Sequence, residues 1–599
     1  MSDNSSNRTD VSTIHLDNIS LQNRENVDNN SSKFIGFDLS TQQLKAIVVD
    51  EKLKICHHVN VHFDKELAEY KTKAGVHASD DGSNVVTVPV NMWLKALDMC
   101  FEKLKIDGLD FSTVVAISGC AQQHGSVWWR NETGKLLANL NPDDYLHKAL
   151  VSAFSLRDSP IWMDSSTTQE CRWIERFVGG PMRLAEITGS RAYERFTGPQ
   201  IAKVFRQRPD IYAATERITL ISNFLASILC GSYAPLDASD ASGMNMMNIK
   251  TKRWSEQCLA AIVDGSKEEV HGLRARLGCL DSTMNDNIID THEVVGRISH
   301  YFIERYGFPP ECLVSSFTGD NPGSMAGFCI GKDELIISLG TSDTALFWLE
   351  HPSPGINGHV LRNPIDENQY MGLICFKNGS KTRERIRDTC ANGDWDEFSR
   401  LLNMVPRGNF GNIGFYYDLR EIYPLCVGDF RYDKQNQRVE SFSSELEVRA
   451  CVEGQFLRLY HHSKALGLDM TNLRRVLVTG GASTNEAILQ VAADVFHSPV
   501  YTLELPNSAC LGSAYLAKYA YELEQQKLNQ SFDKATSDIV ENYPIDFAEM
   551  VFGSEENDKN LVKVADPTPI ASSVDAYDSL LNRFTQLEDQ ISLNNDDTI

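Results

Sequence analysis

The short segment Thr318 to Asn321, with the sequence Thr-Gly-Asp-Asn, holds the residue types best suited to proton transfer. It follows an apolar run, Leu313 to Phe317, that is typical of a buried strand. A carboxylate at the end of a strand can accept the proton of a hydroxyl, and the adjacent Asn321 can hydrogen-bond a second hydroxyl. We therefore predict that Asp320 is a general base. An Asp-Asn pair is also common in turns, which leaves a purely structural role open.

A polar turn near residue 40 has the residue types that bind phosphate groups and their metal ion. In Phe34 to Asp50, FIGFDLSTQQLKAIVVD, apolar runs flank small polar residues, which predicts a β-hairpin. Asp38 can bind Mg²⁺, Thr41 can face phosphate oxygens, and Lys45 can reach the phosphates as a point charge. A surface hairpin with a polar turn is the alternative interpretation.

A related pattern returns about three hundred residues later, in Leu335 to Glu350, LIISLGTSDTALFWLE. Here Gly340 and Thr341 can present backbone N–H groups and a hydroxyl to a phosphate, although Gly-Thr-Ser also suits an ordinary hairpin turn. Both hairpins contain a leucine, a small residue and a threonine at the turn. This repetition predicts a duplicated β-rich core, with one copy in each lobe.

A third glycine-containing turn lies in Val476 to Phe496, VLVTGGASTNEAILQVAADVF. The pattern predicts a strand, a turn at Gly480 and Gly481, and then a helix whose capping box is formed by Ser483 and Glu486. Glycines allow close approach of a ligand to the backbone, and the start of a helix favours a negative or electron-rich group. An ordinary strand-to-helix turn explains this segment equally well.

Histidines and basic residues elsewhere are less informative. His124, in the segment QQHG, suits the binding of sugar hydroxyls but also suits a structural role. Cys120 does not make it a zinc site, because one C-x₃-H pair offers only two ligands. We expect His57-His58 and His461-His462 to face solvent. The basic stretch Lys381 to Arg387 is interpreted first as a charged helix face and second as a phosphate contact.

Composition narrows the class of protein. A chain of 599 residues requires two or more domains, and its formal charge of -24 disfavours binding to nucleic acid or to an anionic membrane surface. The sequence predicts no transmembrane helix and no signal peptide, so we expect a cytoplasmic protein. The 14 cysteines contain no CxxC pair and are expected to stay reduced. A small-molecule partner fits this composition best.

Three segments in a fixed order carry a family resemblance. Asp38 to Thr41, Leu339 to Ser342 and Thr479 to Ser483 resemble the two phosphate motifs and the adenosine motif of the actin-like ATPase superfamily. The segments QQHGS, ERFTGPQ (Glu194 to Gln200) and TGDN resemble the FGGY carbohydrate kinases. Longer matches, among them PIWMDSSTTQEC and GSRAYERFTGPQ, are similar to the xylulose kinases of that family, from about Phe34 to about Leu516.

The resemblance implies an α/β fold of two RNase-H-like lobes with a deep cleft between them. We expect a disordered tail over 1–32, a sugar-binding lobe over 33–330 and a nucleotide-binding lobe over 331–550. An acidic linker and terminal helix are expected over 551–599. The implied activity is the ATP-dependent phosphorylation of D-xylulose to D-xylulose 5-phosphate with Mg²⁺, by a monomer or weak homodimer.

Site residues follow from the motifs and the resemblance together. Asp38 is expected to bind the metal ion, and Asp320 to act as the catalytic base. The sugar-binding residues are expected to be His124, Arg195, Asp320 and Asn321. The nucleotide-binding residues are expected to be Thr41, Lys45, Gly340, Thr341, Trp395, Gly480, Gly481, Ala482 and Asn485. Asp240 lies in a family-like segment and is interpreted as structural, because TGDN already supplies the base.

This sequence departs from the pattern of its relatives at two positions. Ser40 stands where most of the superfamily has glycine, and Ser166 stands where many bacterial relatives have arginine. Two alternatives to xylulose phosphorylation stay open. One is an FGGY kinase for another substrate, such as ribulose, gluconate or glycerol. The other is a non-catalytic or chaperone-like ATPase, which would hydrolyse ATP without a sugar.

Overall fold

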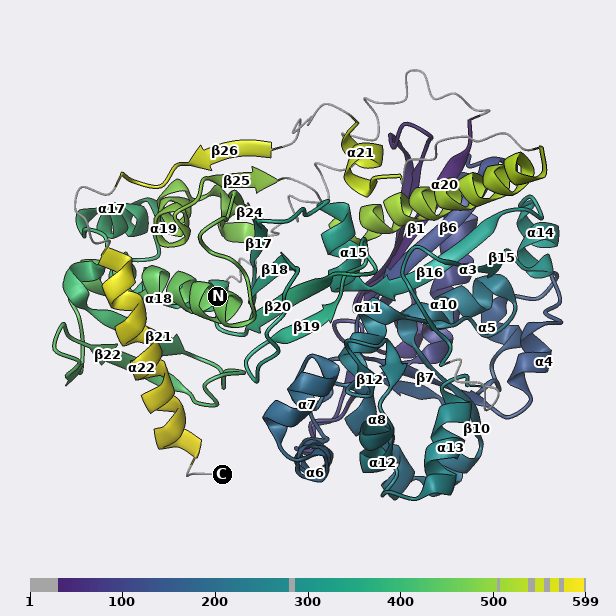
Figure 1. Cartoon of the computed structure of the whole chain (residues 1–599), viewed down its shortest axis with the longest axis horizontal. Helices are drawn as coiled ribbons and strands as arrows, with labels where there is room; N and C mark the ends of the chain where they lie inside the picture. Colours follow the sequence, from purple (N-terminus) through teal and green to yellow (C-terminus); the bar gives the residue numbers. More distant parts are fainter. Residues whose placement is uncertain are drawn as a thin grey trace, which may run out of the picture.

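The computed structural model describes residues 31–279, 286–503, 507–536, 545–553, 561–569 and 576–596. Two large β-sheets form the centre of the molecule, one built mainly from the first half of the chain and the other from the second half (Figure 1). The tail predicted over 1–32 lies outside the described residues except for its last two. The α/β fold class predicted from the sequence is confirmed.

The N-terminal sheet has six strands in the order β15-β16-β6-β1-β2-β3. Strands β1, β6 and β16 run parallel, and the remaining strands are antiparallel to their neighbours. Their almost unbroken burial fits strands that are covered on both faces. The bounds are β1 (Lys33–Leu39), β2 (Gln43–Val49), β3 (Ile55–His62), β6 (Val114–Ala121), β15 (Val294–Arg297) and β16 (Leu313–Gly319).

The C-terminal sheet has seven strands in the order β19-β20-β18-β17-β24-β25-β26. Here β17, β24 and β25 run parallel to one another, and β17 forms an antiparallel hairpin with β18. The bounds are β17 (Glu334–Leu339), β18 (Asp343–Leu349), β19 (His359–Arg362), β20 (Tyr370–Phe376), β24 (Arg475–Thr479), β25 (Val500–Leu503) and β26 (Leu561–Ala565).

The two sheets share one spatial arrangement of six strands, and β19 is an additional edge strand of the C-terminal sheet. In each, a hairpin (β1-β2 or β17-β18) is followed by two parallel strands (β6 and β16, or β24 and β25) and an antiparallel edge strand (β15 or β26). The duplicated core predicted from the two hairpins is therefore confirmed. Because parallel strands end at the same edge of a sheet, each copy brings two or three turns together at one edge.

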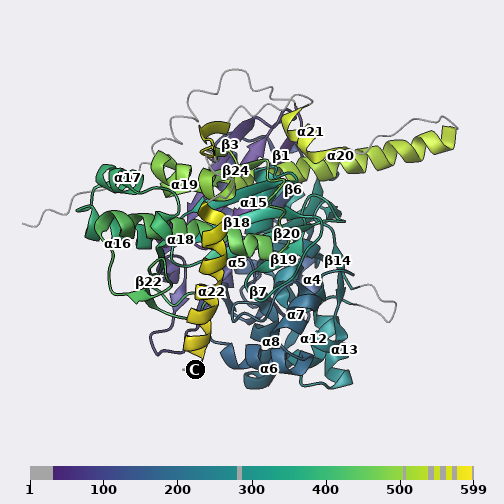
Figure 2. The same cartoon turned by 60° about the vertical axis from the view of Figure 1, so that its left-hand side comes forward.

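Helices cover both sheets. On the N-terminal sheet, α3 (Val90–Ile106) packs on β2 and β3, and α10 (Ile221–Cys230) packs on β6 and β16. On the other face lies α20 (Ser508–Thr536), which comes late in the chain but packs on β1 and β6 (Figures 1 and 2). Gly36 permits this contact, because a Cβ at Gly36 would lie 2.3 Å from the Cys510 oxygen.

The C-terminal sheet is covered by α18 (Ser444–Ala465) and α19 (Glu486–Phe496), which pack on each other. Helices α16 (Ser380–Cys390) and α17 (Trp395–Met404) lie against α18. The last described helix, α22 (Ala576–Asp596), crosses α18 (Figure 2). Strand β26 joins the edge of the sheet, so the described parts of 551–599 add one strand and one helix to the C-terminal half.

Shorter elements complete the described chain. The remaining helices are α2 (Phe63–Glu66), α4 (Thr133–Leu137), α5 (Leu146–Ala149), α6 (Thr168–Val178), α7 (Pro181–Thr188), α8 (Thr197–Gln207), α9 (Pro209–Ala213), α11 (Ala238–Ala241), α12 (Glu256–Ile262), α13 (Lys267–Arg276), α14 (His300–Tyr306), α15 (Asp320–Gly327) and α21 (Phe547–Phe552). Small sheets are formed by β7 (Ser126–Arg130), β8 (Phe154–Leu156) and β10 (Thr215–Leu220), and by β21 (Ile413–Tyr417), β22 (Gly428–Tyr432) and β23 (Arg438–Val439). None of the helices in the described ranges has the length and apolar character needed to cross a membrane.

Candidate active site

Three of the segments singled out in the sequence meet at one edge of the N-terminal sheet. Leu39 of β1 pairs with Ala121 of β6, and Ala121 pairs with Gly319 of β16. The residues that follow these strand ends are therefore neighbours in space, although they are separated by up to about 280 residues in sequence. This edge brings together the Ser40-Thr41 turn, the Gln123-His124 segment and the Asp320-Asn321 pair.

Asp38 and Lys45 face each other across the first hairpin. Lys45 Nζ lies 3.1 Å from Asp38 Oδ2, and Ser40 Oγ donates a hydrogen bond of 2.6 Å to the same oxygen. The other carboxylate oxygen, Oδ1, accepts a weak hydrogen bond from the thiol of Cys120 at 3.8 Å, its one such partner within the described ranges. Burial lowers the pKa of Lys45, but the Asp38 carboxylate more than offsets burial and raises that pKa above its usual value. One oxygen of this buried carboxylate thus has a weak donor as its described partner.

Asp320 lies at the first position of α15, where β16 ends. Part of its surface stays exposed, yet the surrounding protein desolvates the carboxyl group and raises its pKa to about 7, with a further contribution from the charge of Asp38. Asn321 donates from Nδ2 to Asp320 Oδ1 at 3.2 Å and to Gln123 Oε1 at 2.9 Å. The carboxylate is therefore held in place and able to change protonation near neutral pH.

A second buried carboxyl group lies behind this pair. Gln123 Nε2 is 3.4 Å from Asp240 Oδ1, and Ser222 Oγ donates to Asp240 Oδ2 at 2.6 Å. Burial raises the pKa of Asp240 to about 8, and the charges of Asp237 and Asp320 add to this shift. Asp240 is buried among these contacts, whereas Asp320 keeps an exposed face, and the structural role of Asp240 stays a prediction.

His124 and Arg195 come together beside this edge, and a strand of the other sheet joins them. Arg195 Nη2 lies 2.7 Å from Nε2 of His359 on β19, and its guanidinium stacks on Tyr193. The His124 ring lies 4.4 Å from that of Phe196, and its Nδ1 is 3.1 Å from the Gly243 oxygen. Burial and the nearby Arg195 charge lower the pKa of His124 well below its usual value, so this ring is neutral.

The corresponding edge of the C-terminal sheet is built mainly from backbone. Ser338 of β17 pairs with Thr479 of β24, so the Gly340-Thr341 turn and the Gly480-Gly481 turn are neighbours. Gly480 has φ +93° and lies so close to β17 that a Cβ would come 2.6 Å from the Leu339 oxygen. A Cβ at Gly481 would meet no described atom within 4 Å, so this glycine borders open space.

Family comparisons identify the scaffold that carries these two edges. The model for the N-terminal domain of the FGGY family of carbohydrate kinases matches residues 154–329, and the model for the C-terminal domain matches residues 335–521. The xylulose kinase of Rattus norvegicus is 45% identical over 557 residues, which cover 93% of this chain and 96% of that protein. The chain belongs to the FGGY family of carbohydrate kinases.

Other relatives agree with this assignment. Xylulose kinase 2 of Arabidopsis thaliana is 44% identical, with 82% of this chain and 87% of that protein covered. Among solved structures, a ligand-bound xylulose kinase from Lactobacillus acidophilus matches with a TM-score of 0.68 and 18% identity, covering 94% of this chain and 98% of that one. A gluconate kinase from the same organism matches with a TM-score of 0.69 and 17% identity, at the same coverage. At such identities the two structures show the shared fold alone.

The remaining predicted nucleotide residues of this FGGY kinase lie around the Gly480-Gly481 turn. Asn485 donates from Nδ2 to Ser399 Oγ at 2.9 Å and caps α19 through its Oδ1. The capping box predicted for Ser483 and Glu486 is therefore wrong, because α19 begins at Glu486 and Asn485 is its N-cap. Ala482 lies in the short 3₁₀ turn before this cap. Trp395 starts α17 and is 37% exposed, with Arg387 stacked on its ring.

Two expectations about charged and polar side chains in this FGGY kinase need correction. Arg383, within the stretch interpreted as a charged helix face, is buried and bonds both oxygens of the buried Asp343 at 2.7 and 3.0 Å. His462, expected to face solvent, is buried as well. His359 was not singled out from the sequence, because nothing in its local pattern indicates that β19 returns to Arg195. The two corrections and the missed His359 all concern contacts between distant segments.

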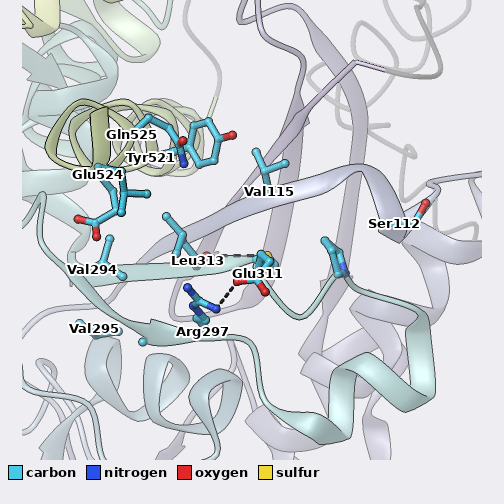
Figure 3. Close-up of a pocket in the computed structure, with 14 residues that line it drawn as sticks. Ser112, Val115, Val294, Val295, Arg297, Glu311, Leu313, Tyr521, Glu524 and Gln525 are labelled. Carbon is cyan, nitrogen blue, oxygen red and sulfur yellow. Dashed lines mark hydrogen bonds and ion pairs between the residues drawn. The ribbon is translucent and has the colours of Figure 1, made fainter. Parts of the chain in front are cut away.

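The cavity of about 610 Å³ found in the described part of this FGGY kinase does not include the predicted site residues. It lies between the β15-β16 edge and the second half of α20, and its lining includes Val115, Leu313 and Tyr521 (Figure 3). Leu313 starts β16, whereas Asp320 follows its other end, so the cavity and the candidate site lie at opposite ends of the sheet. The deep cleft predicted between the lobes stays a prediction.

Proposed function

We propose that this chain transfers the γ-phosphoryl group of ATP to D-xylulose and forms D-xylulose 5-phosphate. The observation that carries the proposal is the half-buried Asp320 at the end of β16, whose pKa of about 7 suits a general base at neutral pH. In the proposed step, Asp320 takes the proton of the sugar hydroxyl and the hydroxyl oxygen bonds to the γ-phosphorus. The bond from that phosphorus to the β–γ bridging oxygen breaks, and ADP leaves.

On the sugar side, we assign substrate binding to His124, Arg195 and Asn321 together with Asp320. Asn321 is fixed by Gln123, so its amide can bond a hydroxyl without competing for the transferred proton. Arg195 offers N–H donors, and the neutral His124, whose Nδ1 donates to the Gly243 oxygen, offers Nε2 as an acceptor, a combination that suits the hydroxyl groups of a ketose. These residues all precede 330, which supports the proposed sugar-binding lobe at 33–330.

Asp38 is the proposed ligand of the metal ion. Its Oδ2 is engaged by Lys45 and Ser40, whereas Oδ1 faces only a thiol, so a hard oxygen remains for a cation. A single carboxylate with water and phosphate oxygens is a common environment for Mg²⁺, so the residues present fit this ion. When bound there, Mg²⁺ would neutralise charge on the phosphates, while Lys45 would add a second positive charge beside them.

For the nucleotide, we propose the Gly340-Thr341 turn and the open space beside Gly481. The Gly340 N–H donates to the Ser342 oxygen at 3.3 Å, so a phosphate oxygen would have to replace that long bond. The Gly340-Thr341 turn would bind phosphate oxygens together with Thr41 of the other lobe. Gly480, Gly481, Ala482 and Asn485 would line the nucleoside side, with the exposed Trp395 flanking it. These residues, except Thr41, follow 330, which supports a nucleotide-binding lobe beginning near 331.

The choice of sugar rests on the relatives. Xylulose kinases of two mammals and a plant are 44–45% identical to this chain over at least 82% of its length. A site that bonds each hydroxyl rejects a substrate that lacks one by several powers of ten, because buried polar groups are then left unpaired. We therefore expect D-xylulose to have a higher kcat/KM than D-ribulose, gluconate or glycerol.

A coupled assay of ADP release over these four substrates tests the proposal. D-xylulose should give the highest kcat/KM, and ATP hydrolysis without sugar should be slow, because water would be excluded from a closed site. A higher kcat/KM with glycerol or gluconate would contradict the substrate and leave the kinase activity standing. Fast hydrolysis that no sugar stimulates would instead favour an ATPase without a sugar substrate.

A further inference from the structure

A buried arginine joins the C-terminal helix to the body of the protein. Arg458 of α18 lies between two buried carboxylates, with its Nη1 3.1 Å from Glu421 Oε2 and its Nε 3.2 Å from Glu588 Oε1. Its guanidinium also stacks 3.6 Å from the centre of the Phe376 ring. Glu588 belongs to α22, which follows the region 335–521 matched by the FGGY C-terminal domain model. The arginine therefore connects an added helix to the sheet of the kinase fold.

The same ion-pair network continues to the turn proposed to bind phosphate. Glu421 accepts hydrogen bonds from the Lys377 N–H at 2.9 Å and from Asn378 Nδ2 at 2.9 Å. The next residues are bonded directly to the turn, since the Gly379 N–H donates to the Thr341 oxygen at 3.2 Å. The Ser380 N–H donates to the Gly340 oxygen at 2.8 Å. A continuous series of contacts thus runs from the buried Glu588 through Arg458 and Glu421 to the backbone of Gly340 and Thr341, which lie at the surface.

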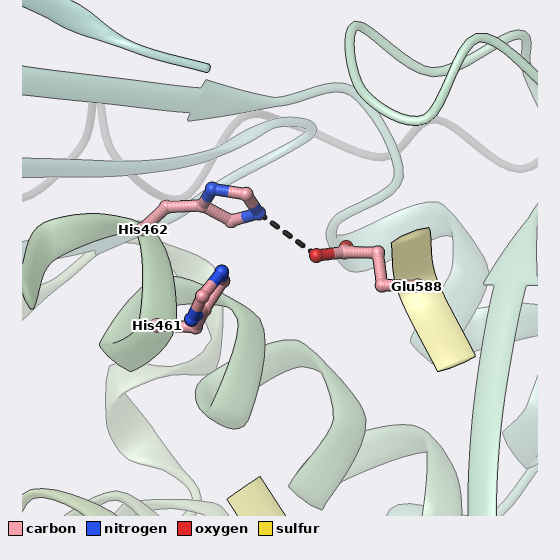
Figure 4. A group of neighbouring side chains, drawn as sticks. All are labelled: His461, His462 and Glu588. Carbon is pink, nitrogen blue, oxygen red and sulfur yellow. Dashed lines mark hydrogen bonds and ion pairs between the residues drawn. The ribbon is translucent and has the colours of Figure 1, made fainter. Parts of the chain in front are cut away.

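His462 contacts Glu588 at the far end of this series. Its Nε2 lies 3.0 Å from Glu588 Oε2, with His461 beside it (Figure 4). Burial raises the pKa of Glu588, but the neighbouring His462 and Arg458 outweigh burial and hold that pKa below its usual value. Glu588 is therefore a carboxylate that is hydrogen-bonded through Oε2 and ion-paired with Arg458 through Oε1, and these two contacts orient it.

The cluster of His461, His462 and Glu588 also has the composition of a metal site, since ligand atoms of all three lie within 4.8 Å of one another. Two contacts favour the ion-pair assignment instead. Arg458 lies against the second oxygen of Glu588, and a positive guanidinium there repels a bound cation. In addition, His461 Nδ1 lies 3.2 Å from the Thr585 hydroxyl, so a protein partner already occupies one of its two ring nitrogens.

We propose that Glu588 is a positioning residue for nucleotide binding, acting through Arg458 and Glu421 on the Gly340-Thr341 turn. The inference rests on the proposed function in one respect, namely that this turn binds phosphate. Backbone donors bind an anion best when they are already oriented, because no reorganisation is then needed. By holding Arg458 against Glu421, Glu588 fixes the segment 377–380 that supports the turn.

The variant Glu588→Gln tests this proposal with little damage to the fold. It keeps the shape and an acceptor for His462, and Arg458 keeps Glu421 as its counter-ion, so no buried charge is left unpaired. The matched control is Tyr577→Phe on the same helix. Its hydroxyl bonds the buried Arg449 and Glu453 at 2.9 and 2.7 Å, contacts that hold α22 without involving the Glu421 series.

Binding of ADP and of D-xylulose is measured separately by calorimetry on the full chain. We expect Glu588→Gln to raise the Kd of ADP about three- to tenfold and to leave the Kd of D-xylulose within twofold. Tyr577→Phe should leave both constants within twofold, whatever it does to Tm. An unchanged Kd of ADP in Glu588→Gln, or an equal rise in both variants, overturns the proposal. ADP binding is measured without turnover, so this test remains valid even if D-xylulose is not the substrate.

Hydrogen exchange and a second variant keep the proposal testable if Glu588→Gln folds poorly. Glu421→Gln keeps a single acceptor oxygen, for either Lys377 or Asn378, and removes the attraction to Arg458, so it should weaken ADP binding at least as much. In either variant the amides of Gly379 and Ser380 should exchange faster than in the wild type, and in Tyr577→Phe they should not. Unchanged exchange at these two amides would show that the turn does not depend on the series.

Discussion

The two sheets share a strand order but end in different chemistry. At the edge of the N-terminal sheet, side chains dominate, and Asp38, Lys45, Gln123 and Asn321 are held by mutual hydrogen bonds or ion pairs. At the edge of the C-terminal sheet, glycines dominate, and Thr341, Gly480 and Gly481 are exposed. The proton transfer proposed at the first edge requires a desolvated carboxyl group, which Asp320 provides. The phosphate binding proposed at the second edge requires small residues and open space beside the backbone.

The largest effect should come from the N-terminal edge. Asp320→Asn keeps the size and hydrogen-bonding capacity of the side chain but cannot take a proton, so kcat should fall about 10²- to 10⁴-fold with sugar affinity largely retained. The matched control is Asp240→Asn, because burial raises the pKa of Asp240 to about 8 and the wild-type group is largely protonated at pH 7. We expect that control to lose less than about tenfold in kcat.

Steady-state kinetics with D-xylulose and ATP check both variants. If Asp240→Asn loses as much activity as Asp320→Asn, the proton acceptor cannot be assigned to Asp320 alone. A nearly wild-type kcat for Asp320→Asn would falsify its assignment as the base.

Lys45 should produce the next largest effect, since it belongs to the N-terminal edge but is proposed to serve the nucleotide. Lys45→Ala removes a positive charge that would stabilise the transferring phosphoryl group, and turnover should fall on the order of 10²-fold with weaker ATP binding. The Kd of D-xylulose measured without ATP should stay nearly the same. Weakened xylulose binding with normal ATP kinetics would instead place Lys45 on the sugar side.

The glycine pair tests the C-terminal edge. Gly481→Ala adds a methyl group in open space, so Tm should stay the same. If ADP occupies that space, the extra atom must be accommodated at a cost of about 1–3 kcal/mol, and the Kd of ADP should rise about tenfold.

Gly480→Ala is the matched control for this pair. It places a side chain at φ +93° and against the Leu339 oxygen, so it should lower Tm by disturbing the turn itself. ADP titration and thermal unfolding distinguish the two variants. Normal ADP affinity in Gly481→Ala would mean that the nucleotide lies elsewhere.

The difference between the edges also explains what the sequence could predict. The hairpins, the Gly480-Gly481 turn and the strand before Asp320 were predicted because their signals are local, namely alternating apolar runs and small residues at fixed spacing. The duplicated core could be predicted for the same reason. Residue types alone, however, do not distinguish an arginine in a buried ion pair from one on a solvated helix face, as the burial of Arg383 shows.

Contacts between distant segments were beyond the sequence. Arg195 meets His359, which lies 164 residues later, and Gly36 meets Cys510, which lies 474 residues later. Neither residue carries a local pattern that indicates its partner, because the contact depends on how whole sheets and helices pack. The raised pKa of Asp320 belongs to the same class, since it arises from burial that only the folded chain provides.

The smallest expected effect is that of Asp320→Asn on thermal stability. This variant should gain stability although it loses activity. The pKa of Asp320 is about 7 in the folded protein and about 4 in an unfolded chain, so the folded state binds this proton more tightly. The stability that the protonated group contributes is fully present below about pH 4 and is lost as pH rises through 7. Asp320→Asn never carries the charge and avoids this loss.

We therefore expect Asp320→Asn to unfold at a higher temperature than the wild type at pH 8. Because Asp320 is partly exposed, solvent reduces the effect, and a gain of about 2 °C is expected for a chain of this size. The gain should shrink between pH 8 and pH 5, where the wild-type carboxyl is protonated in the folded state. Over the same range, kcat/KM of the wild type should fall below pH 7 as the base is protonated, and that of Asp320→Asn should stay flat. Thermal unfolding and kinetics at matched pH values provide both measurements, and a Tm difference that is constant with pH would show that Asp320 has an ordinary pKa.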